Sequence, residues 1–292
     1  MDFQISEDSA PSEFISEEQR RQLVGRPPAS GAFLIGDPVG QRKFSDVFDL
    51  SLESGDVLRN ARLAYETWGD LNQERSNAVL VLHALTGDSH TTGPSGDGHP
   101  TAGWWNGLIG PGLPIDTDKY FVICPNVIGG CQGSTGPATA HPEDGQLYGS
   151  RFPVITIRDM VRAQVRLTDM LGIRKWHSVV GGSMGGMQVL EWAVTFPDRV
   201  KTIVPIATCV QATAQQIAWG AIGRRAIRLD PKWRNGEYYG AAIGEGPWEG
   251  LAIARMISQV TFRSDNVFTE RFGRALVDMD ADYNGLGLWD RF

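Results

Sequence analysis

The residues best suited to covalent chemistry lie in the segment 177–196, around Ser183. Val179 and Val180 come first, a turn of sequence Gly-Gly-Ser-Met-Gly-Gly follows, and apolar residues then recur at helical spacing. A strand, a glycine-flanked serine and a helix form the context of a nucleophile elbow. Such a turn lifts Oγ out of the sheet, and the helix N-terminus favours negative charge that develops there. Ser183 is therefore the predicted nucleophile, and an incidental serine in a glycine-rich turn is the alternative.

A serine nucleophile needs a general base, but every histidine of the chain precedes Ser183. They are His83, His90, His99, His141 and His177. In folds that carry this elbow, the catalytic groups follow the order serine, acid, histidine along the chain. We therefore expect the acid and the histidine to lie beyond residue 292, so that residues 1–292 would be an inactive fragment truncated at the C-terminus. The alternative is an unusual upstream base, for which His83 is the best candidate.

A second segment, residues 83–87, has the right place for an oxyanion hole. It leaves an apolar run at residues 77–82 as a loop of sequence His-Ala-Leu-Thr-Gly. In elbow enzymes one amide comes from the residue after the nucleophile and the other from such a loop. These rules predict the Met184 and Leu85 amides as the two donors. An ordinary exit from a strand is the alternative, because backbone donors require no particular side chain.

Arg255 is the third candidate, because it interrupts an apolar helical run of sequence Leu-Ala-Ile-Ala-Arg-Met at residues 251–256. If this helix is mostly buried, its guanidinium needs an anionic partner. A substrate carboxylate would be a functional partner, and an acidic residue of the same helical region would be a structural one. The sequence leaves both interpretations open and gives the structural pair more weight.

The elements that must position these residues follow an α/β pattern. A hairpin is predicted over residues 44–68, and strands are predicted at 77–82, 120–125, 177–182 and 200–207. A helix is predicted over residues 156–171, ending at Gly172. Strands that alternate with helices and long loops indicate a mostly parallel sheet with right-handed crossovers. The loop at residues 126–137 is too rich in glycine for either element.

Three regions are expected along the chain. Residues 1–32 are polar, without an apolar period, and are predicted to be a disordered acidic tail. Residues 33–209 are predicted to form the α/β core. Residues 210–292 show helical patterns at 211–229, 248–260 and 266–276 and no strand pattern, which predicts a helical lid inserted after a strand.

Composition excludes several classes of function. The formal net charge of −7 argues against a general nucleic-acid-binding protein. No apolar run is long enough to cross a membrane, and the N-terminus lacks the pattern of a signal peptide. Three sparse cysteines predict no disulfide framework and favour a reducing cytoplasm, and no Cys/His spacing predicts a metal site.

Four motifs in combination resemble the homoserine O-acetyltransferase family. They are His-Ala-Leu-Thr-Gly-Asp from His83, the Asn-to-Pro loop at 126–137, Gly-Gly-Ser-Met-Gly-Gly-Met-Gln from Gly181 and Ala-Arg-Met from Ala254. The resemblance covers residues 44–292. It implies an α/β-hydrolase fold with an inserted helical lid.

The resemblance also implies a reaction, namely ping-pong transfer of an acetyl group from acetyl-CoA to the hydroxyl of L-homoserine in methionine biosynthesis. Ser183 would carry the acyl group, the Leu85 and Met184 amides would bind the oxyanion, and Arg255 with Phe262 nearby would bind the acceptor. Relatives often have tyrosine where this chain has Phe262. A homodimer formed through the lid is expected, with no cofactor besides the co-substrate acetyl-CoA. Transfer of succinyl groups, serine as acceptor and simple ester hydrolysis remain alternatives.

Overall fold

The computed structural model describes residues 27–272 of the protein, and these residues divide into two compact units. The first unit runs from Gly31 to Gln211, and the second contains residues 27–30 and 212–272. Most of the predicted tail, residues 1–26, lies outside the described residues.

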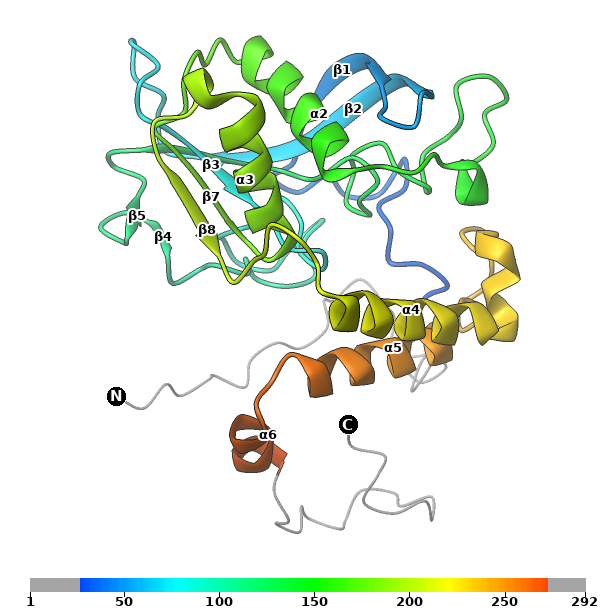
Figure 1. The fold of residues 1–292 in the computed structure, drawn as a ribbon. Coiled ribbons are helices and arrows are strands. Elements are labelled where there is room, and N and C mark those ends of the chain that lie inside the picture. Colours follow the sequence, from blue (N-terminus) through cyan, green and yellow to red (C-terminus); the bar gives the residue numbers. More distant parts are fainter. Residues whose placement is uncertain (1–26, 273–292) are drawn as a thin grey trace. The chain divides into compact units, whose positions relative to one another are not determined.

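The first unit is built on a six-stranded sheet with the order β1-β2-β6-β3-β7-β8 (Figure 1). Its strands are β1 (Lys43–Ser51), β2 (Val57–Trp68), β3 (Ala78–Leu82), β6 (Phe121–Pro125), β7 (Ser178–Gly182) and β8 (Ile203–Ile206). The strands β6, β3, β7 and β8 run parallel, whereas β1 and β2 form the predicted hairpin and join antiparallel to β6. The predicted mostly parallel α/β sheet is thereby confirmed, and the six strands fall in the predicted ranges, except that β1 begins one residue earlier, at Lys43.

Strand β3 is buried over its whole length, as its uninterrupted apolar sequence predicts for a central parallel strand. Its carboxyl end and that of β7 lie side by side, because Leu82 pairs with Gly181 in a parallel ladder. The loops that follow these two strands, the loop from His83 and the turn at Ser183, therefore emerge at the same edge of the sheet. Two short strands, β4 (Ile109–Gly110) and β5 (Ile115–Asp116), form a separate ladder between β3 and β6 in the chain.

Two helices pack together in the first unit, α2 (Ile157–Met170) and α3 (Met184–Thr195) (Figure 1). The Gln164 side chain of α2 joins them, since it donates to Gln188 over 2.6 Å and accepts from the Trp192 indole over 2.8 Å, both on α3. Helix α2 begins with a capping box formed by Thr156 and Asp159. Short 3₁₀ turns, η1 (Gly149–Arg151) and η2 (Pro197–Arg199), complete this unit.

The second unit is helical, as the sequence predicts. It contains α4 (Ala214–Leu229), the turn η3 (Pro231–Gly236), α5 (Trp248–Thr261) and α6 (Asp265–Phe272). Helices α4 and α5 pack closely where Gly250 lies against the Ala226 carbonyl, and the Gly250 amide donates to Asp230 over 3.0 Å. None of the described helices is long and apolar enough to span a bilayer.

Candidate active site

Ser183 lies between β7 and α3 in a strained backbone conformation, with φ 54° and ψ −119°. A positive φ is uncommon for a residue with a side chain, and it persists only where the surrounding structure enforces it. Two hydrogen bonds enforce it here: the Ser183 amide donates to the Ile206 carbonyl over 3.0 Å, and Thr208 Oγ1 donates to the Ser183 carbonyl over 2.8 Å. The residue is exposed. The turn has the geometry that presents a serine hydroxyl as a nucleophile.

The glycines beside Ser183 are required by close contacts. A Cβ added at Gly185 would lie 2.0 Å from the Leu82 carbonyl oxygen, and one at Gly181 would lie 2.6 Å from the backbone of Gly185. A Cβ at Gly186 would lie 2.6 Å from Cβ of Thr208. These distances are far below van der Waals contact, so only glycine lets α3 approach β3 and β7 this closely.

The loop after β3 forms a tight turn in which the Gly87 amide donates to the Ala84 carbonyl over 2.9 Å. Leu85 and Thr86 occupy the centre of this turn, and the hydrogen bond that closes the turn does not use their amides. Leu85 and Met184 both line one pocket of about 440 Å³. The predicted oxyanion residues are thus brought to one pocket, which the sequence alone did not establish.

His83 anchors this loop with both of its ring nitrogens. Nδ1 lies 2.8 Å from the Ala84 carbonyl oxygen, so it carries the proton and donates, while Nε2 accepts from the Val127 amide over 3.1 Å. The side chain is 2% exposed, and burial lowers the pKa of His83 below its usual value. Neither ring nitrogen of His83 is free to accept a proton from Ser183. The structure therefore does not support His83 as the alternative general base.

This neutral histidine predicts a loss of stability in acid. The pKa of His83 is lower in the folded state than in the unfolded state. When the pH falls below about 6.5, the unfolded chain therefore binds a proton at His83 that the folded chain does not bind. The stability is present above that pH, and below it the free energy of unfolding should fall by about 1.4 kcal/mol per pH unit until the folded-state pKa is reached. Thermal melts between pH 7.5 and 5 measure this slope.

The control for this prediction is His83→Gln, which keeps an acceptor for the Val127 amide and cannot titrate in this range. The variant is expected to be less stable than the parent at pH 7.5 and to show a flatter dependence on pH. An unchanged slope would mean that other groups cause the acid sensitivity.

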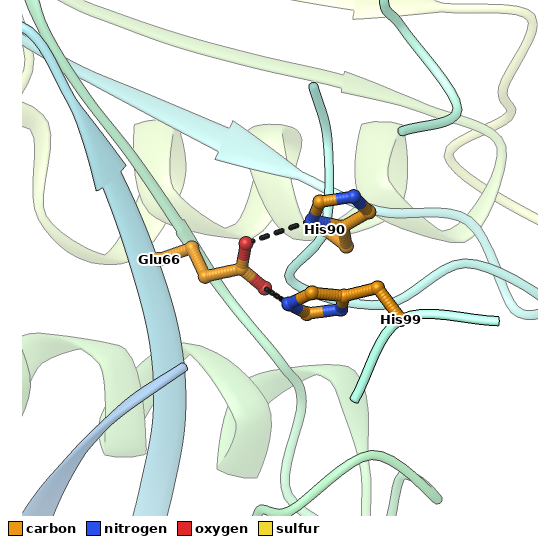
Figure 2. A group of neighbouring side chains, drawn as sticks. All are labelled: Glu66, His90 and His99. Atoms are coloured by element: carbon orange, nitrogen blue, oxygen red, sulfur yellow. Dashed lines mark hydrogen bonds and ion pairs between the residues drawn. The ribbon is translucent and has the colours of Figure 1, made fainter. Parts of the chain in front are cut away.

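One buried group has the side chains of a metal site, Glu66, His90 and His99 (Figure 2). Glu66 Oε2 accepts from His90 Nδ1 over 2.9 Å, and His99 Nε2 lies 3.7 Å from Oε1 and accepts from the Gln41 amide over 3.1 Å. The two imidazole rings are stacked, with centroids 3.8 Å apart and planes inclined by 10°. Nitrogen lone pairs lie in the ring plane, so stacked rings cannot both point at one ion about 2.0–2.1 Å away. The geometry favours a hydrogen-bonded group over a metal centre.

The pKa values of the two histidines of this group shift in opposite directions. Burial opposes a charge on His90, but the hydrogen bond to Glu66 and the negative charge of Glu66 outweigh it and raise the pKa of His90. Burial lowers the pKa of His99 despite the attraction of Glu66. Glu66 was not among the site residues predicted from the sequence. The alternation of β2 could have indicated it, because Glu66 is two residues from the buried Ala64 and therefore points to the same face of the sheet.

Arg255 and Phe262, the predicted acceptor-binding residues, both belong to the second unit. Arg255 lies on α5 and is exposed, and Phe262, the C-cap of that helix, is 82% exposed. The premise of a mostly buried helix is wrong, since Leu251 and Ile253 are about half exposed as well. Within residues 27–272 no ion pair is formed by Arg255, so the structural pair considered from the sequence is not present there. Its role remains a prediction.

Comparison with known proteins agrees with this fold and with the elbow. The family model of the alpha/beta hydrolase fold matches residues 77–288. Homoserine O-acetyltransferase of Leifsonia xyli subsp. xyli is 55% identical over 275 residues, covering 94% of this chain and 68% of that protein. The enzyme of the same name from Thermobifida fusca is 57% identical over 248 residues, covering 85% of this chain and 65% of that protein.

Solved structures give a similar picture. Homoserine O-acetyltransferase from Bacillus anthracis superposes with a TM-score of 0.74 at 32% identity, over 81% of this chain and 64% of that one. Esterase E22 superposes with a TM-score of 0.73 at 31% identity, over 82% of this chain and 66% of that one. The chain thus spans about two thirds of the length of the relatives it matches. By its sequence and its fold, the chain belongs to the homoserine O-acetyltransferase family of α/β-hydrolase-fold proteins.

Proposed function

We propose that the protein transfers an acetyl group from acetyl-CoA to the hydroxyl of L-homoserine, in methionine biosynthesis, through an acyl-serine intermediate. The strained turn at Ser183, beside a pocket shared by Leu85 and Met184, carries the proposal. The names of the relatives that are 55% and 57% identical supply the acetyl group and the acceptor. The experiment that tests it is detection of acetylated Ser183 after incubation of the full-length protein with acetyl-CoA alone.

In this reaction the Ser183 hydroxyl oxygen attacks the thioester carbonyl carbon, and its proton passes to a general base. His83 is not that base, because its nitrogens already bond to Ala84 and Val127. The carbonyl oxygen becomes negatively charged, and the amides of Leu85 and Met184 donate hydrogen bonds to it. The carbon–sulfur bond then breaks, coenzyme A leaves as the thiol after taking a proton, and the homoserine hydroxyl attacks the serine ester in the second half of the cycle.

Ester hydrolysis is the nearest alternative, and the fold alone does not separate it from transfer. Esterase E22 superposes as well as the transferase from Bacillus anthracis does, with TM-scores of 0.73 and 0.74. Sequence identity favours transfer, because the relatives that are more than half identical are transferases by name. Nothing observed favours a succinyl donor or serine as the acceptor over acetyl-CoA and homoserine.

Arg255 is proposed to bind the carboxylate of homoserine, which a guanidinium can meet with two parallel hydrogen bonds. Arg255→Ala should therefore raise the KM for homoserine and lower kcat/KM roughly 30- to 1,000-fold. This corresponds to a loss of roughly 2–4 kcal/mol of transition-state stabilisation. Acetylation of Ser183 does not use the acceptor and should be nearly unchanged. Arg255→Lys should rescue only part of the loss. Steady-state kinetics and the rate of Ser183 acetylation measure the two effects.

The matched control is Arg228→Ala, which removes another exposed arginine from the same helical unit, on α4. That variant should leave the KM for homoserine unchanged. Equal damage by Arg255→Ala to both half-reactions would show that the residue supports the helices and does not bind the acceptor.

The proposal includes a homodimer formed through the helical unit, which would serve as the lid. Its support is the set of apolar side chains that α4 and α5 leave exposed, including Ile217, Ile222 and Val260. No metal or cofactor besides acetyl-CoA is required by the proposed chemistry. A cytoplasmic location is proposed because acetyl-CoA is available there, and all three cysteines are free, as expected in a reducing compartment.

A further inference from the structure

The wall of the candidate pocket, from Leu85 to Asp88, is followed at once by two buried residues. Ser89 is completely buried and His90 is 5% exposed. Both donate to one carboxylate: Ser89 Oγ to Glu66 Oε1 over 2.8 Å, and His90 Nδ1 to Glu66 Oε2 over 2.9 Å (Figure 2). Each oxygen of Glu66 therefore binds one of the two residues that directly follow the pocket wall.

Glu66 itself is fixed, because it lies on β2 opposite Cys124 of β6 in the antiparallel ladder. His90 is in turn connected to the pocket wall, because its amide donates to Asp88 Oδ1 over 2.8 Å. The Asp88 carbonyl also accepts from the Trp104 indole over 3.1 Å. At the other end of the wall, His83 fixes the Ala84 carbonyl around which the Leu85 turn closes. The turn is thus anchored at both ends, by His83 on one side and by Glu66 on the other.

We propose that Glu66 is a positioning residue for acyl transfer, which sets the place of the Leu85 amide by holding Ser89 and His90 against the sheet. This inference rests on the function proposed above. An oxyanion donor is effective only at hydrogen-bond distance from the charged oxygen of the transition state, so a loosened wall lowers the rate of acylation. Binding of the acetyl donor depends less on that distance, because the charge is absent in the bound substrate.

Glu66→Gln is the informative substitution, because it keeps the volume of the side chain and leaves only one acceptor oxygen for two donors. We expect the rate of Ser183 acetylation at saturating acetyl-CoA to fall about tenfold, which is less than the 10²–10³ typical for complete loss of an oxyanion donor. The KM for acetyl-CoA should change little. Hydrogen exchange of the amides in residues 84–90, followed by mass spectrometry, should become faster.

Asp116→Asn is the matched control. Asp116 is also a mostly buried carboxylate of the first unit, and it accepts from the amides of Gly112 and Asp118 in a loop that does not line the pocket. This variant should lose thermal stability and keep the acetylation rate. Ser89→Ala is a second, milder probe that removes one of the two donors to Glu66, and its rate should fall less than that of Glu66→Gln.

The outcomes separate the two proposals. If the full-length protein forms no acetyl-Ser183, the proposed function fails, whatever the variants do. If the parent is acetylated and folded Glu66→Gln and Ser89→Ala match it in rate, the positioning role is refuted. A rise in the KM for acetyl-CoA without a fall in the maximal rate also refutes it, since that would assign Glu66 to substrate binding.

Discussion

Ser183→Ala is expected to abolish acetyl transfer, with a loss on the order of 10³-fold or more, as removal of a covalent nucleophile usually causes. The expectation follows from the turn at Ser183, whose φ of 54° holds an exposed hydroxyl at the start of α3. Incubation of the full-length protein with acetyl-CoA alone should leave one acetyl group on this residue. Intact-mass analysis detects the adduct, and parallel initial-rate lines identify the ping-pong order.

Ser178→Ala is the control, because Ser178 opens the strand β7 that leads into the same turn. This variant should acetylate Ser183 normally. Intersecting initial-rate lines, together with an unmodified parent protein, would contradict a covalent route. The donor and acceptor would then have to be bound at the same time.

Among alanine substitutions of glycines in the first unit, Gly185→Ala is expected to reduce the stability of the fold most. The added Cβ would lie 2.0 Å from the Leu82 carbonyl oxygen, and 2.7 Å from its carbon. Both are backbone atoms of the central strand and cannot rotate away, so α3 or β3 must move. Overpacking of this kind costs about 1–3 kcal/mol where side chains can yield, and a larger loss is expected here. Thermal melts and the yield of soluble protein measure it.

Gly182→Ala provides the comparison within the same turn. A Cβ at Gly182 would meet only the Ile206 carbonyl oxygen, at 4.0 Å, which is ordinary contact. That variant should fold with a melting temperature close to the parent value. Similar stability of the two alanine variants would show that the elbow is less tightly closed than the structure describes.

Local sequence was sufficient to predict most of the first unit. The apolar run of β3 and the hairpin of β1 and β2 have strong strand patterns in the sequence. The glycines around Ser183 predicted the turn, and the structure shows that close packing requires glycine there. The general rules for nucleophile elbows also pointed to the loop after β3 as a source of an oxyanion amide, and the parallel pairing of β3 with β7 brings that loop to the same edge of the sheet as Ser183. These features depend on short segments and on general rules of α/β topology.

Other features depend on contacts between distant segments, which periodicity does not report. Glu66, His90 and His99 come from a strand and from two places in a long loop, and no spacing links them. The run around Arg255 shows a different difficulty. Its apolar residues predict a covered helix, yet Leu251 and Ile253 remain half exposed, because composition does not say what covers a face.

The central position of β3 has a consequence for synthesis of the protein. Leu80 of β3 pairs with Val179 of β7, which lies 179 − 80 = 99 residues later in the chain. The ribosome must therefore add 99 further residues before β7 can pair with β3. At ribosomal speeds of about 5–20 residues per second, that wait lasts roughly 5–20 seconds. During this time an entirely apolar strand, Ala78–Leu82, has an unpaired edge in a nascent chain. Chaperones that shield such segments should therefore matter more for β3 than for the hairpin of β1 and β2, which closes locally as soon as it is made.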